Sequence, residues 1–531
     1  MTSTFAAAPS ATSRTEADPA VTDPVRVGIG GLSFAEVVRV ARRDAPIELT
    51  PDALDEMARS AGVIAALASD TRPHYGVSTG FGALASKQIP FERRTQLQRS
   101  LVRSHAAGSG PEVEREVVRA LMLLRLSTLA TGRTGVRPVV AQTYAAVLNA
   151  GITPIVREYG SLGCSGDLAP LAHCALALMG EGDVRDVAGA VVPASVALRA
   201  EGIAPLELVE KEGLSLINGT DGMLGMLVLA LTDLRRLVTT ADLAAAMSVE
   251  GLRGVDSVFA ADLQELRPHP GQRDSAANIR AVLDGSELLA RPDGFARVQD
   301  AYSLRCAPQV HGGVRDTIDH AARVAERELS AAVDNPAVTI DGRVESNGNF
   351  HGAPIAYVLD FLAIVSADLA SMSERRTDRF LDVARNHGLN AFLADDPGVD
   401  SGHMIAQYTQ AAIVSELKRL GVPASVDSIP SSAMQEDHVS MGWSAARKLR
   451  RAVDGLSRVL AIELLTAARA LDMRAPLRPG PVSSAVVAQL RTAVAAPGED
   501  RYLAPEISAA HGMVVDGTLL DAARGAGGVL V

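Results

Sequence analysis

The chain has 531 residues, of which 47% are apolar and only 3% aromatic, so alanine, leucine and valine must build the core, which favours helix over strand. The formal net charge is −11 and no basic block stands out, so a nucleic acid is not expected as a partner. Three cysteines in so long a chain argue against a disulfide framework and indicate a reducing, cytoplasmic location.

The N-terminal 24 residues, MTSTFAAAPSATSRTEADPAVTDP, are rich in Ser, Thr, Ala and Pro. They lack the apolar core of a signal peptide, and their acidic residues argue against a transit peptide. We therefore predict a disordered tail over residues 1–24.

Beyond the tail, VRVGIGG is compatible with a short strand, and residues 48–69 predict a helix with Thr50 as N-cap and Pro51 at its first position. Apolar residues at helical spacing predict the remaining helices over residues 111–132, 138–151, 216–252, 312–334, 352–381, 403–420 and 439–471. The chain is thus expected to be mostly α, with a long central helix bundle.

The most apolar stretch singled out, GMLGMLVLAL, is too short to span a bilayer and is bracketed by Asp221 and Asp233, so we expect a buried helix and no membrane partner. Histidines are scattered, without an H-x-x-x-H or C-x-x-C pair, so no metal is expected. No G-x-G-x-x-G motif follows a strand, so no nucleotide cofactor is expected either.

Polar segments rich in Gly, Ser and Asn separate the predicted helices, and in a helix bundle such loops are where chemistry is placed. They are HYGVSTGFG, SHAAGSG, GCSGD, NGTDG, QDAYSLR, ESNGNFHG and SSAMQEDH.

Cys164, Ser165 and Gly166 have three interpretations. The first is a tight turn, with Asp167 capping the helix LAPLAHCALALMG. The second is a nucleophile, but Ser165 lacks the final glycine of a nucleophile elbow, and nothing in the spacing favours Cys164 as a thiol nucleophile with a histidine base. The third is self-processing: the Gly166 nitrogen attacks the Cys164 carbonyl, and loss of water there and from Ser165 leaves an imidazolone with an exocyclic methylidene.

The motifs YGVSTGFG, SGDLAPLAH, NGT, QDAYSLR, NGNFHG and QEDHVSMGW occur in the order found in the aromatic amino-acid ammonia-lyases, which the chain resembles from about residue 25 to its last helices. The resemblance implies a fumarase/aspartase-like superfamily architecture. It also implies a 4-methylideneimidazol-5-one (MIO) group formed autocatalytically from Cys164, Ser165 and Gly166. Cys164 stands where the family usually has Ala, and Ser78 where it commonly has Asn.

The resemblance also divides the body, residues 25–531, into an N-terminal part (25–205) carrying the MIO loop, and the long-helix bundle with the C-terminal helices (206–531). It implies a homotetramer whose active sites combine loops from several subunits. RSHAAG and SSAMQEDHVSMGW resemble the histidine-type members most closely, and His105 and Glu436 suit a buried imidazole, which needs polar partners. The implied reaction converts L-histidine to trans-urocanate and ammonia, the first step of histidine degradation.

The family's site residues carry over as follows. Tyr75 is the base, and nearby positive charge or helix N-termini should favour its phenolate. Tyr302 assists near the substrate ring and amine, and Arg305 holds the substrate carboxylate as a bidentate pair. The remaining substrate-binding residues are His105, Asn218, Gln299, Phe350 and Glu436.

Two alternatives stay open at this point. One is a tyrosine or phenylalanine ammonia-lyase, or an aminomutase, of the same family. The other is a helical oligomeric scaffold without catalytic activity, which would keep Cys164, Ser165 and Gly166 unprocessed and be two waters heavier.

Overall fold

The computed structural model describes residues 23–70, 74–84, 86–290 and 298–531, so residues 1–22 of the predicted tail lie outside the described residues. The described part is mostly helical, as predicted. Its α-helices are α1 (Phe34–Arg43), α2 (Pro51–Ala68), α3 (Arg94–His105), α4 (Arg115–Ala130), α5 (Pro138–Asn149), α6 (Leu168–Leu178), α7 (Ala194–Ala200), α8 (Glu212–Ile217), α9 (Asp221–Gly251), α10 (Ala261–Glu265), α11 (Pro270–Leu283), α12 (Glu287–Ala290), α13 (Tyr302–Arg305), α14 (Ala307–Leu329), α15 (Ala353–Leu381), α16 (Met404–Leu420), α17 (Gly442–Asp472), α18 (Pro481–Leu490), α19 (Ala504–Asp516) and α20 (Thr518–Gly525).

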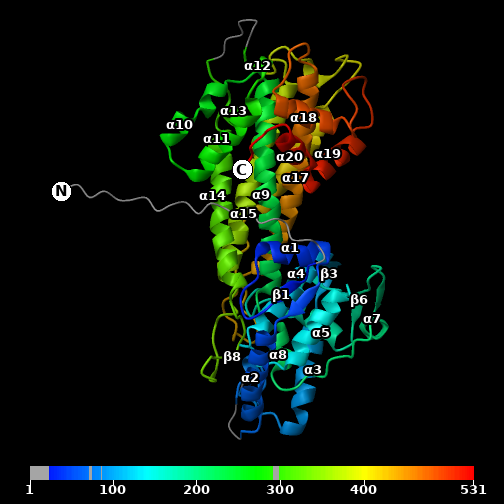
Figure 1. Ribbon diagram of the computed structural model, residues 1–531, viewed down its shortest axis with the longest axis vertical. Coiled ribbons are helices and arrows are strands. Elements are labelled where there is room, and N and C mark those ends of the chain that lie inside the picture. Colours follow the sequence, from blue (N-terminus) through cyan, green and yellow to red (C-terminus); the bar gives the residue numbers. More distant parts are fainter. Residues whose placement is uncertain (1–22, 71–73, 85, 291–297) are drawn as a thin grey trace, which may run out of the picture.

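Short strands pair into small sheets around the lower half of the molecule in Figure 1. β1 (Val25–Val27) pairs in parallel with β2 (Ile47–Leu49), which confirms the strand expected in VRVGIGG. The other strands pair antiparallel: β3 (Ser109–Glu112) with β5 (Arg157–Tyr159), β6 (Asp183–Arg185) with β4 (Thr153–Pro154) and β7 (Val191–Pro193), and β8 (Ala337–Val338) with β9 (Val344–Glu345).

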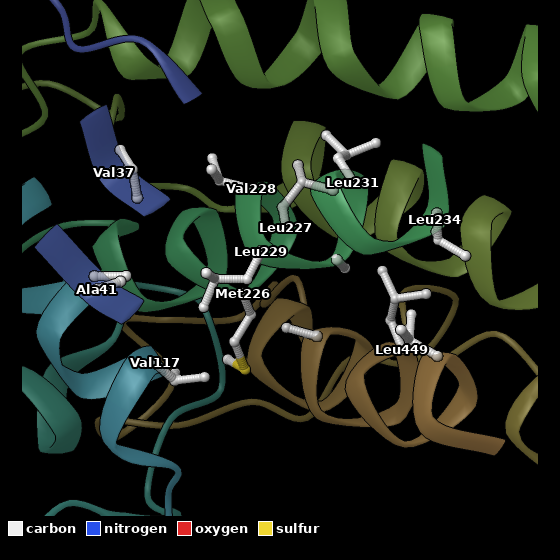
Figure 2. Close-up of a cluster of buried hydrophobic side chains, with 14 of the residues drawn as sticks. Val37, Ala41, Val117, Met226, Leu227, Val228, Leu229, Leu231, Leu234 and Leu449 are labelled. Atoms are coloured by element: carbon white, nitrogen blue, oxygen red, sulfur yellow. The ribbon is translucent and has the colours of Figure 1, made fainter. Parts of the chain in front are cut away.

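The long helices α9, α14, α15 and α17 run side by side along the longest axis and form the predicted central bundle (Figure 1). α9 is buried along almost its whole length, because most of its side chains are apolar and neighbouring helices pack around it. In Figure 2, side chains of α9 such as Met226 and Leu229 lie among Val37 of α1, Val117 of α4 and Leu449 of α17. The segment GMLGMLVLAL is therefore a buried helix, as expected.

Helix boundaries differ from the prediction where the chain breaks before a bundle helix. The helix expected over 216–252 is two helices, because α8 ends at Ile217 and α9 begins at Asp221. The helix expected over 312–334 begins earlier, with Pro308 in its first turn, and ends at Leu329. The break at residues 218–220 matters for function, because it places Asn218 outside regular structure.

One described helix, α15, is long and apolar enough to cross a membrane by length and composition, although the sequence analysis singled out a different stretch. In the fold, 61% of its apolar window is buried by neighbouring helices. α15 packs against α14, α16, α17 and α9. It is thus a bundle helix of the fold.

Candidate active site

The Cys164–Ser165–Gly166 turn lies directly against the backbone of Gly219. Gly166 has φ of +75°, and a Cβ at this position would overlap the carbonyl group of Gly219. The next residue also contacts Gly219, because the Asp167 backbone N–H donates to the Gly219 carbonyl at 2.7 Å. Only glycine fits at position 166, and the turn brings two backbone segments into direct contact.

Two distant loops hold the chain just before the turn. The Gly163 carbonyl accepts from the Ser440 hydroxyl at 2.9 Å and from the Gly352 backbone N–H at 3.1 Å. The Met441 backbone N–H donates to the Leu162 carbonyl at 2.9 Å. The segments NGNFHG and QEDHVSMGW, far apart in sequence, therefore meet at the turn.

Asp167 corrects one prediction, because its side chain does not cap α6, the helix that it precedes. Its carboxylate instead accepts from the backbone N–H groups of Gly222 and Met223 in the first turn of α9, at 2.8 and 2.9 Å, and from the Ser161 hydroxyl at 3.0 Å. Burial raises the pKa of Asp167 to about 7, from 3.8. The residue ties the turn to the start of the central helix.

A cavity of about 730 Å³ opens beside the turn and is lined by five of the predicted site residues: Tyr75, His105, Ser165, Asn218 and Glu436. Its apolar wall includes Leu168, Leu214 and Ile217, and Lys87, Asn335 and Ser432 add polar groups; none of these six was predicted. Leu168 and Ser432 lie within the motifs SGDLAPLAH and SSAMQEDH, which could have identified them, whereas the other four lie outside the quoted motifs. A concave, mostly apolar cavity with a few convergent polar groups is typical of a small-molecule site.

Glu436 reaches over the turn. Its Oε2 accepts from the Cys164 thiol at 3.1 Å and from the Ser431 hydroxyl at 2.8 Å, and its Oε1 accepts from the Ser165 hydroxyl at 3.3 Å. Burial and the neighbouring Glu436 raise the pKa of Cys164 to about 12, so the thiol stays protonated and is a poor nucleophile at neutral pH. This argues against Cys164 as the nucleophile considered above.

His105, at the end of α3, is held in one tautomer. Its Nδ1 lies 2.9 Å from the Leu101 carbonyl oxygen, and a carbonyl only accepts, so Nδ1 carries the proton. In the neutral ring Nε2 is then a hydrogen-bond acceptor. Together with the Glu436 carboxylate, the cavity offers two acceptors to a ligand with N–H groups.

Tyr75 also lines the cavity, but its electrostatics differ from the expectation. Its hydroxyl oxygen accepts from the Gly82 backbone N–H at 3.3 Å. Burial raises the pKa of Tyr75, and the carboxylates of Glu436 and Asp334 raise it further. The Gly82 N–H, at the start of the short 3-10 helix Gly82–Leu84, lowers this pKa, as expected of a helix N-terminus, whereas no positive side chain among the described residues of the same chain is among its causes.

Asn218 follows the end of α8, and its own carbonyl accepts from the buried Arg125 side chain at 2.6 Å. Its side-chain Oδ1 is buried and has no hydrogen-bond partner among the described residues. A buried acceptor without a partner costs free energy, so this atom is available to a bound group in the cavity.

The other predicted residues do not line this cavity. Tyr302 and Arg305 lie on α13, at the opposite end of the bundle from α3 and α8 (Figure 1), and Gln299 precedes them in an exposed segment. The Arg305 guanidinium lies 4.8 Å from the centroid of the Tyr302 ring, so these two share one side, as predicted. Phe350 is part of the NGNFHG loop that contacts Gly163 through Gly352, outside the cavity lining.

Comparison with known proteins agrees with this geometry. Residues 32–492 match the family model for aromatic amino acid lyases. Histidine ammonia-lyases of Streptomyces griseus and Streptomyces avermitilis are 66% and 64% identical, each over 94% of this chain and 98% of the relative.

Solved structures of the same family resemble this chain over nearly its whole length. A tyrosine aminomutase from Streptomyces globisporus is 38% identical with a TM-score of 0.88, over 94% of this chain and 98% of that one. The histidine ammonia-lyase from Trypanosoma cruzi is 36% identical with a TM-score of 0.88, over 95% of this chain and 96% of that one. The chain therefore belongs to the aromatic amino acid lyase family.

Proposed function

We propose that this chain is a histidine ammonia-lyase, which converts L-histidine to trans-urocanate and ammonia without oxidation. The observation that carries the proposal is the cavity in which the Ser165 turn, His105 and Glu436 meet. The relatives at 64% and 66% identity, named histidine ammonia-lyase, support it. An aminomutase is a second candidate, because the Streptomyces globisporus tyrosine aminomutase has the same fold at a TM-score of 0.88.

The residues of the turn fit an MIO group formed from Cys164, Ser165 and Gly166. Gly166 has the left-handed backbone that a residue with a side chain rarely adopts, its nitrogen is the one that would close the ring, and Ser165 lies at the cavity wall. The unpartnered Oδ1 of Asn218 could accept from a group bound beside the turn. Once formed, the group supplies an electrophile that bonds the substrate amine and makes it a better leaving group.

His105 and Glu436 would recognise the imidazole. A neutral imidazole has one N–H donor, and Nε2 of His105 is placed by the Leu101 carbonyl to accept from it. A phenyl ring would leave Nε2 of His105 without a donor, which costs about 1–3 kcal/mol for a buried polar group. This favours histidine over phenylalanine as substrate.

Tyr75 would remove the β-proton of the substrate. To act as a base it must lose its own proton, yet Glu436 and Asp334 disfavour the phenolate. A cation must offset them, and Arg305 of a second copy would supply it while it holds the substrate carboxylate. Tyr302, Gln299 and Phe350 would complete the site in the roles given above.

A homotetramer would bring the two ends of the bundle from different copies together. On α15, Tyr357, Phe361 and Ile364 lie at helical spacing on one face and are 47%, 46% and 44% exposed, and Ile405 and Tyr408 of α16 are exposed as well. Apolar patches of this kind are typical of subunit interfaces. We propose that other copies cover this face, and that the enzyme is cytoplasmic.

An absorbance assay with L-histidine, run beside L-tyrosine and L-phenylalanine, tests the proposal. Urocanate formed from histidine alone is the expected result. Coumarate or cinnamate would keep the ammonia-lyase chemistry and refute the imidazole assignment of His105 and Glu436. If none of these three acids forms, a β-amino acid among the products would indicate the aminomutase. An intact mass that lacks the loss of two waters would indicate the scaffold.

A further inference from the structure

Buried charged residues hold the short helix that carries Tyr302 and Arg305. α13 has only four residues, and Tyr302 is 69% exposed, so the helix cannot fix its own geometry. A side chain that must serve a second copy has to be placed before that copy arrives. The question is what holds α13 in place.

Arg376 of α15 gives the first contact. Its side chain is fully buried, and Nη1 donates to the carbonyl oxygen of Ser303, in the middle of α13, at 3.1 Å. The rest of its guanidinium pairs with both oxygens of Glu463 of α17, at 2.5 and 2.8 Å. Ser248 of α9 donates to the same carboxylate at 2.7 Å. Side chains from three bundle helices thus form one buried network, and its Arg376 donates to the carbonyl between Tyr302 and Arg305.

A second contact holds the chain on the other side of Tyr302. The Asp300 carboxylate accepts from the Val255 backbone N–H at 2.6 Å. Beyond it, the Arg305 guanidinium lies over the Tyr302 ring at 4.8 Å. With Asp300 and Ser303 both held, the backbone that carries Tyr302 and Arg305 cannot shift without breaking one of these hydrogen bonds.

Stability alone is a poor explanation for the Arg376–Glu463 pair. Both side chains have no exposed surface, and replacing a fully buried ion pair by apolar residues is often neutral or stabilising. The feature that apolar residues could not replace is the N–H donated to Ser303.

We propose that Arg376 and Glu463 are positioning residues of the substrate-carboxylate site, which fix Tyr302 and Arg305 through the Ser303 carbonyl. The inference rests on the proposed function, in which these two residues complete the cavity of a second copy. It predicts that loss of the pair weakens binding of the substrate carboxylate, which Arg305 would hold, more than binding of the imidazole and amine, near which Tyr302 would lie.

The test variant is the double substitution Arg376→Met with Glu463→Leu, studied in the full chain. The matched control is Lys448→Met with Asp360→Leu, because this pair joins the same two helices at 2.7 Å without touching α13. For each, KM and kcat for L-histidine are measured, with the inhibition constant of histamine, which has the imidazole and amine but no carboxylate.

We expect the test variant to raise KM for histidine by about tenfold or more, since a displacement of about 1 Å can cost a hundredfold. The histamine constant should change clearly less than the histidine KM, because histamine lacks the carboxylate that Arg305 would hold, and the control should change neither constant beyond about twofold. An unchanged histidine KM, or an equal shift in both constants, would overturn the proposal.

If the double variant does not fold, Arg376→Lys gives the same test, because lysine cannot bridge both Glu463 oxygens and the Ser303 carbonyl at once. The results expected of Arg376→Lys, and the results that would overturn the proposal, are those given for the double variant. A wild-type enzyme that does not act on histidine would refute the proposed function instead.

Discussion

Replacing His105 with leucine removes the ring nitrogen that we expect to accept from the substrate imidazole. Nδ1 of His105 donates to the Leu101 carbonyl at 2.9 Å, so Nε2 is the acceptor. A neutral hydrogen bond of this kind contributes about 1–2 kcal/mol, and kcat/KM for L-histidine should fall about 5- to 30-fold. The loss should be confined to substrates that have the matching N–H.

Histidines methylated on one or the other ring nitrogen provide the assay. In the wild type, methylating the substrate nitrogen that donates to His105 should lower kcat/KM. In His105→Leu the decrease caused by the lost hydrogen bond should disappear. The comparison is a double-mutant cycle between enzyme and substrate. Ser104→Ala is the control, because Leu101 still holds Nδ1. If the ratio between histidine and each methylhistidine is the same in wild type and His105→Leu, the assigned hydrogen bond does not exist.

Other substitutions test the turn. Gly166→Ala should abolish the loss of two waters in the intact mass, because the added Cβ overlaps Gly219 and φ of +75° is strained for alanine. Cys164→Ala should keep that loss, because only the carbonyl of residue 164 joins the ring. Burial raises the pKa of Asp167 from 3.8 to about 7, so the native state keeps a proton that the unfolded chain releases over this range. The free energy of unfolding should therefore fall, by up to about 4 kcal/mol, as the pH rises from about 4 to about 7. Denaturant unfolding of Asp167→Asn should lack that slope, and a variant as pH-dependent as the wild type would contradict the raised pKa.

The helices of the bundle could be predicted because the sequence features that identify a helix lie within the helix itself. Apolar residues at helical spacing, with Pro51 or Pro138 at a helix start, identify helices without knowledge of their neighbours. Thr50 occupies the predicted N-cap position, although its side chain makes no cap hydrogen bond. The sequence placed Asp167 just as accurately before α6 but could not show that its carboxylate serves α9, because that contact depends on tertiary packing.

The same limit applies to the site. Tyr75, His105, Ser165, Asn218 and Glu436 are predicted from their motifs and share one cavity. Of the two carboxylates that raise the pKa of Tyr75, Glu436 is a predicted site residue, but Asp334 could not be predicted, because it reaches the site through a fold contact and no motif marks it. Asp334 accepts from the fully buried Lys211 at 2.6 Å, a pair joined across more than a hundred residues.

The separation of Tyr75 from Arg305 within one chain leads to a last prediction, on how complete sites are assembled. Tyr75→Phe and Arg305→Gln should each be inactive when expressed alone, since one lacks the proposed base and the other the proposed carboxylate ligand. Co-expression should restore activity, because a site that takes Tyr75 from one chain and Arg305 from another is intact in about one quarter of random combinations. If both residues came from the same chain, no mixture could contain an intact site. Co-expressed chains that assemble into mixed tetramers and stay inactive would therefore exclude sites shared between subunits.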